Sequence, residues 1–94
     1  MADPVMVEVH PTPNVNALKF VVNRKVAEGR SQTYQSAEQA AAHPLAARLF
    51  TIPGVKMVFL LNDFITVTRD PAADWGTIAP RAEESIRGHF ESQD

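Results

Sequence analysis

Three histidines are the residues of this 94-residue chain whose side chains titrate near neutral pH and commonly bind metals. They are His10, His43 and His89, and their spacing matches no metal-binding motif. We interpret His10 as the end of a strand, His43 as a cap before a proline, and His89 as part of a helix surface. Weak iron binding by these histidines with carboxylates, without any thiolate, stays open as an alternative function.

Other side chains that carry catalysis or hold cofactors are absent or poorly arranged. The chain contains no cysteine, which excludes disulfides, thiolate zinc sites, cysteine-ligated iron–sulfur clusters and cysteine nucleophiles. Glu83 and Glu84 are adjacent, so on a helix they point in different directions and form no catalytic pair. No serine lies in a Gly-x-Ser-x-Gly motif, and four scattered glycines form no phosphate-binding loop. The sequence therefore predicts a protein that is not an enzyme and has no cofactor.

Length and composition indicate one globular domain over residues 1–94, with 45% apolar and 21% charged residues. The net charge of −2 argues against a general nucleic-acid binder, which would carry a basic face. Acidic residues gather in residues 70–94, which we interpret as a solvated helix. No apolar stretch approaches the roughly 18–20 residues of a membrane span, and the N-terminus resembles no signal peptide. We expect no membrane partner and a cytoplasmic protein.

The hydrophobic pattern begins with two strands. Residues 5–10 alternate in polarity, and Ala17–Val22 reads as a second strand antiparallel to the first. Between them, TPNVNALKF (residues 12–20) enters the second strand through two asparagines. Asn14 and Asn16 can each accept a backbone N–H two residues on and so form turns. Residues 23–35 read as a polar loop, with brief pairing at a sheet edge at 32–35.

Two short helices, or one kinked helix, are expected over residues 36–50. Ser36 lies three residues before Gln39, a spacing at which each side chain satisfies the backbone donor of the other. The His43-Pro44 step interrupts the helix, because a proline disfavours the helical conformation of the residue before it. Phe50 lies near the end of this region, which turns at residues 53–54.

Residues 55–69 predict a hairpin centred on Asn62-Asp63, whose short side chains tolerate the positive φ of tight turns. The expected pairs are Leu61–Phe64, Leu60–Ile65, Phe59–Thr66, Val58–Val67 and Met57–Thr68. One face, with Val58, Leu60, Ile65 and Val67, reads as core. The opposite face carries Met57, Phe59, Leu61, Phe64, Thr66 and Thr68 and reads as a half-covered surface.

The last helix is expected to have a loose first turn at 74–77 and then to run regularly to about Ser92. Thr77 as its cap would place Pro80 in the first turn, where the missing N–H costs nothing. Together these elements predict an α+β fold in the order β-β-α-β-β-α. An antiparallel sheet of about four strands would carry the helices on one face.

Three segments together resemble one known family. TPNVNALKF (12–20), HPLAARLFTIPGV (43–55) and DFITVTR followed by DW (63–75) are similar to the N-terminal domain of Nfu/NifU-type iron–sulfur cluster scaffold proteins. Their order and spacing match over nearly the whole chain. The sequence departs from the family pattern at Val15, usually proline, at His43, usually serine, and at Leu61, usually glycine.

The resemblance implies a domain associated with iron–sulfur cluster assembly or delivery. Full-length Nfu proteins bind the cluster through a separate C-terminal Cys-x-x-Cys domain, which these residues lack, so we expect a stand-alone copy of the N-terminal domain. It would act as a non-catalytic adaptor through protein contacts. The contact residues expected are Asn14, Asn16, Met57, Phe59, Phe64 and Thr66. A structural or oligomer-forming domain without ligand remains an alternative, although we expect a monomer.

Overall fold

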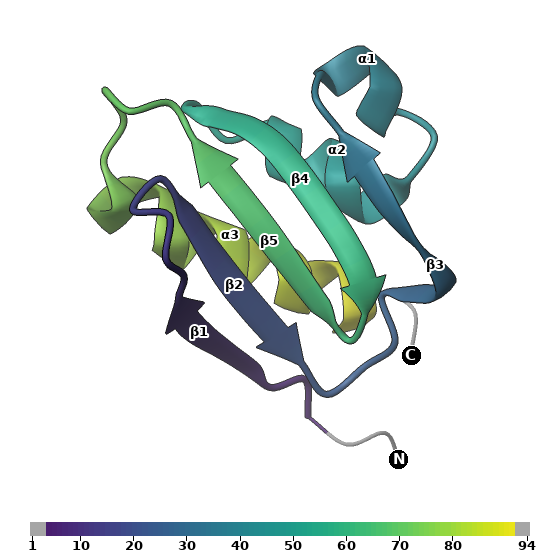
Figure 1. Ribbon diagram of the computed structural model, residues 1–94. Coiled ribbons are helices and arrows are strands. Elements are labelled where there is room, and N and C mark those ends of the chain that lie inside the picture. Colours follow the sequence, from purple (N-terminus) through teal and green to yellow (C-terminus); the bar gives the residue numbers. More distant parts are fainter. Residues whose placement is uncertain (1–3, 92–94) are drawn as a thin grey trace.

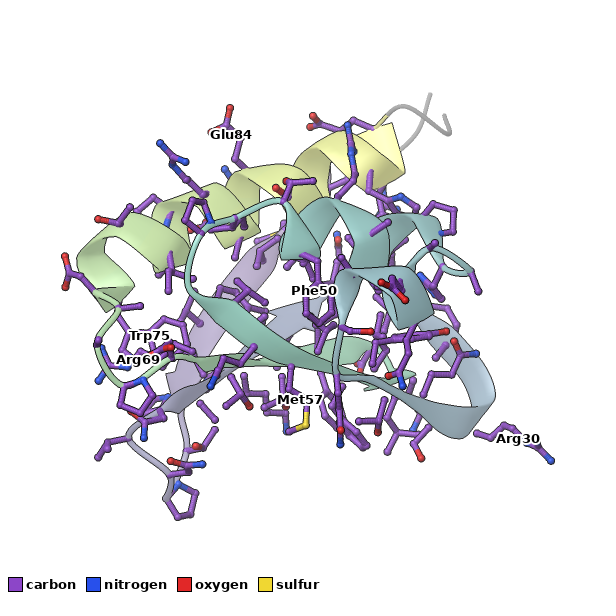
Figure 2. The ribbon with its side chains drawn as sticks, turned by 90° about the horizontal axis from the view of Figure 1, so that it is seen from above. Arg30, Phe50, Met57, Arg69, Trp75 and Glu84 are labelled. Atoms are coloured by element: carbon purple, nitrogen blue, oxygen red, sulfur yellow. The ribbon has the colours of Figure 1, made fainter. Side chains whose placement is uncertain are left out.

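The computed structural model describes residues 4–91 and has the predicted α+β fold. Five strands form one antiparallel sheet in the order β1-β2-β5-β4-β3 (Figure 1). The elements in chain order are β1 (Val7–Pro11), β2 (Ala17–Val22), β3 (Ala27–Tyr34), α1 (Ala37–Ala40), α2 (Pro44–Phe50), β4 (Val55–Asn62), β5 (Phe64–Arg69) and α3 (Trp75–Glu91). The helices all cover the same face of the sheet, as expected (Figure 2). None of the helices in residues 4–91 is long and apolar enough to cross a membrane.

The sheet has one strand more than the sequence indicated. Strand β3 occupies most of the segment that we expected to be a loop, and it pairs with β4 at the sheet edge. The predicted brief pairing is its regular part, where Gln32, Thr33 and Tyr34 lie opposite Leu60, Phe59 and Val58. The pairing shifts register between Ala27 and Gln32, around a glycine with φ of 82°. Main-chain pairing therefore sustains a strand whose polar side chains gave no alternating pattern.

The central hairpin has the predicted register at all five expected pairs. Asn62 takes a φ of 49°, the left-handed conformation that the turn requires. Val58, Leu60, Ile65 and Val67 are fully buried under the helices. The residues of the opposite face are only partly buried. Both predicted faces are confirmed.

Of the two arrangements expected for residues 36–50, the structure has two short helices and not a single kinked one. The Ser36 hydroxyl accepts a hydrogen bond from the Gln39 N–H at 3.2 Å, as predicted. The Gln39 side chain does not return the bond to Ser36, however, and instead accepts the N–H of Gln35 at 2.9 Å. Helix α2 begins at Pro44, where a missing N–H removes no intrahelical bond.

Helix α3 begins earlier than expected. It is regular from Trp75, and the N–H groups of Thr77 and Ile78 both donate to the Asp74 carbonyl at 3.1 Å. The predicted loose first turn is therefore wrong, and Pro80 lies inside the helix on its exposed side. Packing of the buried apolar side of α3 keeps the helix continuous despite the missing donor. The expected end near Ser92 lies outside the described residues.

Ile78, Ala82, Ile86 and Phe90 recur at helical spacing, and all four are buried on one face of α3. His89 is buried as well, and only 8% of it remains exposed. Our interpretation of His89 as a surface residue is therefore wrong. It lies three residues after Ile86, a spacing that places the two side chains on the same side of a helix.

Candidate functional site

The outer face of the sheet, opposite the helices, carries four of the predicted contact residues. Met57 and Phe59 project from β4, and Phe64 and Thr66 project from β5. The antiparallel register places Phe59 opposite Thr66, with Met57 and Phe64 on the neighbouring rungs. All four side chains are partly buried. Figure 2 shows Met57 below the sheet and the helices above it.

An aromatic pair with an adjacent cation forms the middle of this face. The ring centroids of Phe59 and Phe64 are 6.1 Å apart at an angle of 41°. The Lys19 ammonium of β2 lies 4.4 Å from the centroid of the Phe64 ring, which is the geometry of a cation–π contact. Lys19 was not among the predicted contact residues. Lys19 alternates with the core residue Phe20, which places Lys19 on the outer face. Its contact with Phe64 depends on the pairing of β2 with β5, which the sequence did not indicate.

The loop between β1 and β2 is held by its own polar side chains. The Asn14 carboxamide oxygen accepts the N–H of Asn16 at 2.9 Å, which is the predicted turn. The Thr12 hydroxyl oxygen lies 2.9 Å from the Asn14 carbonyl oxygen and 3.0 Å from that of Ala17, and the two carbonyls share its single hydrogen. Asn16 has a different partner from the predicted one: its carboxamide oxygen accepts the Arg69 Nε–H at 3.3 Å. The loop is therefore fixed both locally and to β5.

Four residues, which we call the Arg69 tether, join this loop to the start of α3: Val15, Asn16, Arg69 and Trp75. The Trp75 indole N–H donates to the Val15 carbonyl at 3.0 Å, and the Arg69 guanidinium lies 5.3 Å from the Trp75 ring centroid. Figure 2 shows Arg69 and Trp75 side by side. Arg69 also donates to the Ala73 carbonyl at 2.9 Å. The tether leaves the Val15 side chain 77% exposed.

The histidines do not converge on one point. His10 lies on β1, where it pairs with Lys19, whereas His43 precedes α2 and His89 belongs to α3. Burial lowers the pKa of His89, and the positive charges of His43 and Arg48 lower it further. No group of three metal-binding side chains gathers anywhere in residues 4–91. The His43 Nδ1 is buried without a hydrogen-bond partner in this part of the chain, and its ring lies 6.1 Å from Tyr34.

The fold and the three motifs define a small domain of the iron–sulfur scaffold class. The chain belongs to the family "Scaffold protein Nfu/NifU N terminal", whose model matches residues 7–93. This family is associated with iron–sulfur cluster scaffolds, and the resemblance found in the sequence is confirmed.

Relatives with known names support this membership. The "NFU1 iron-sulfur cluster scaffold homolog, mitochondrial" of Homo sapiens is 38% identical over 89 residues, which cover 94% of this chain and 35% of that protein. The Drosophila willistoni protein of the same name is 40% identical over 90 residues, covering 94% of this chain and 31% of that protein. The chain thus spans about a third of the length of these relatives.

Two solved structures have the same fold. The solution structure of a NifU-like protein from Saccharomyces cerevisiae has a TM-score of 0.82 and 25% identity, over 94% of this chain and 80% of that one. The crystal structure of protein SAV1430 from Staphylococcus aureus has a TM-score of 0.73 and 30% identity, over 85% of this chain and 96% of that one.

Proposed function

We propose that this domain is a non-catalytic adaptor in iron–sulfur cluster assembly or delivery, and that it acts by binding a protein partner on the outer face of its sheet. The partner would be a cluster-assembly protein or an apo-protein that receives a cluster. Membership in the Nfu/NifU N-terminal family supports the pathway. The outer face supports the mode of action, and it is the observation that carries the proposal.

Apolar side chains on this face lack the cover that their counterparts on the other face receive. Helices α1, α2 and α3 all lie over the inner face (Figure 2). Phe59, Phe64 and Met57 therefore stay partly exposed, while Val58, Leu60 and Ile65 are fully buried. Adjacent aromatic rings are frequent anchors of protein interfaces, and burying them removes apolar surface from water. The rigid strands of the hairpin would present these rings with little loss of conformational entropy.

A contact function fits the composition of the chain better than a direct role in holding a cluster. Iron–sulfur clusters are held mainly by cysteine thiolates, and the 94 residues contain none. A domain of a scaffold family that lacks such ligands can still bind a partner protein and hold it in position. It would do so by binding energy alone.

The loop of residues 12–16 would border the same contact. In Figure 2 it extends to the side of the sheet on which Met57 lies. The side chains of Asn14 and Asn16 serve intramolecular hydrogen bonds, so the exposed Val15 is the loop residue best placed to meet a partner. In this proposal the two asparagines act by fixing the loop.

The absence of cysteine permits a site-specific crosslinking test. Thr66→Cys places one thiol on the outer face, and Thr77→Cys places one at an exposed position of α3, on the helical side of the sheet. Each variant would carry a photoactivatable crosslinker on its thiol in extracts of the source organism. We expect Thr66→Cys, and not Thr77→Cys, to capture a cluster-assembly protein or an apo-target.

Two results would contradict the proposal. One is equal capture of the same proteins by both variants. The other is capture by Thr66→Cys of a second copy of the domain alone, which would indicate an oligomer-forming face.

A further inference from the structure

A groove of about 360 Å³ between α2 and α3 gathers positive charge away from the outer face. Its walls contain one arginine from each helix, Arg48 and Arg81, together with two hydroxyl side chains. The full lining is Arg48, Thr51, Ile52, Arg81, Glu84, Ser85 and Gly88. Neither the family match nor the resemblance in sequence assigns a role to this groove.

Helix geometry brings the donors of the groove together. Arg81, Ser85 and Gly88 follow one another at spacings of four and three residues, so they share one face of α3. The Arg48 guanidinium crosses from α2 onto this face, where its Nη1 lies 3.5 Å from the Ser85 carbonyl. Gly88 leaves room for it, because a Cβ at this position would lie 3.3 Å from the same Nη1. The Arg48 guanidinium of α2 is thus in contact with α3.

These two arginines have no carboxylate partner among the side chains that the structure describes. Ion pairs join Lys56 to Asp70 and Arg87 to Glu83, and neither pair includes Arg48 or Arg81. Glu84 borders the groove but projects outward from α3 in Figure 2. With two arginines and one glutamate, the groove has a formal charge of +2 − 1 = +1.

We propose that this groove binds a carboxylate of an acidic peptide segment in a partner protein. A planar guanidinium offers paired N–H donors that match the two oxygens of a carboxylate. The formal charge of +1 suits a single carboxylate better than a phosphate, which carries about −1.5 to −2 near pH 7. The inference rests on the proposed adaptor function only in taking a protein as the source of the carboxylate.

A carboxylate at Arg48 would also act on His89. The charge of Arg48 is one of the causes that lower the pKa of His89, after burial and the charge of His43. A bound carboxylate would offset that charge, so the pKa of His89 would move upward, toward its ordinary value. The imidazole therefore serves as an internal reporter of occupancy.

The test uses short peptides in place of a partner, so that its outcome is independent of the adaptor function. The ¹⁵N-labelled protein would be titrated with acetyl-glycyl-glutamyl-glycinamide at constant ionic strength. The glutaminyl peptide would serve as the uncharged control and inorganic phosphate as the competing anion. The NMR signals of Arg48 Nε–H and of the Ser85 and Gly88 amides would be followed.

We expect saturable shifts at these signals with the glutamyl peptide and an upward shift in the pKa of His89. Arg48→Gln and Arg81→Gln should each weaken binding about fivefold, because each removes charge-assisted donors at an exposed site. Arg87→Gln, the matched control on the same helix, should leave binding unchanged. Equal shifts with the glutaminyl peptide, equal binding by Arg48→Gln, or tighter binding of phosphate than of the glutamyl peptide would each overturn the proposal.

Discussion

Replacing Asn16 by alanine is expected to loosen the Arg69 tether without unfolding the sheet. The substitution removes the carboxamide oxygen that accepts the Arg69 Nε–H at 3.3 Å. It preserves the backbone bond from the Arg69 N–H to the Asn16 carbonyl, at 2.8 Å. It also preserves the bond from Arg69 Nη1 to the Ala73 carbonyl. Only one of these three bonds of Arg69 is therefore lost.

The geometry of that bond sets the size of the effect. Hydrogen bonds to charged groups contribute about 1.5–3 kcal/mol when they are well formed. This bond is long and only part-buried, and water can reach the freed guanidinium, so we expect a loss of about 1 kcal/mol. For a domain of this size, 1 kcal/mol corresponds to a fall in Tm of roughly 4–8 °C. Asn14→Ala, which removes a more exposed bond, should cost about half as much.

The assay can use the single tryptophan of the chain, which belongs to the tether. Urea and thermal unfolding of Asn16→Ala would be followed by Trp75 fluorescence and by circular dichroism. We expect a lower Tm by both probes and a red-shifted Trp75 emission in the folded variant. An unchanged Tm and an unchanged emission would refute the tether as a source of stability. Lost capture of the partner by a fully stable Asn16→Ala would instead show that Asn16 contacts the partner directly.

Two further predictions concern α3 and the turns. Because the pKa of His89 is lowered in the folded state, the unfolded chain binds the proton more readily, and stability falls as the pH drops below about 6.5. In urea titrations, His89→Gln should therefore lose less stability than the wild type between pH 7.5 and 5.5. Equal losses would contradict this prediction. Gly54→Ala should destabilise the domain far more than Gly29→Ala. Both glycines have positive φ, but only at Gly54 would the added Cβ clash, at 2.6 Å from the Cβ of Ala73. Equal Tm values for the two variants in thermal unfolding would contradict this prediction.

The sequence allowed the parts of the fold that depend on local alternation to be predicted. The hairpin register followed from apolar residues on alternate positions around Asn62-Asp63, and the structure has the same pairs. The proline at residue 44 marked the start of α2 for a local reason as well. Met57, Phe59, Phe64 and Thr66 were placed on one surface because alternation alone fixes the face of a strand.

Features that depend on distant partners could not be predicted in this way. Strand β3 has a polar sequence, and only the neighbouring β4 reveals it as a strand. The tether joins residues 53 and 60 positions apart, so no local spacing indicated that Asn16 meets Arg69 or that Trp75 meets Val15. The burial of His89 arises where α3 packs against α2, which the order of elements alone did not show.

The adaptor function is tested most directly with the partner that the crosslinking experiment identifies. This partner would be purified, and its affinity would be measured for variants of the outer face. Phe59→Asp places a charge among the aromatic rings, whereas Val9→Asp places the same charge at a 40% exposed position facing the other side of the sheet, opposite Phe20. If the outer face binds the partner, calorimetry should show at least about 30-fold weaker binding for Phe59→Asp, equivalent to about 2 kcal/mol, and less than about twofold change for Val9→Asp. Wild-type affinity of a folded Phe59→Asp variant would contradict the account.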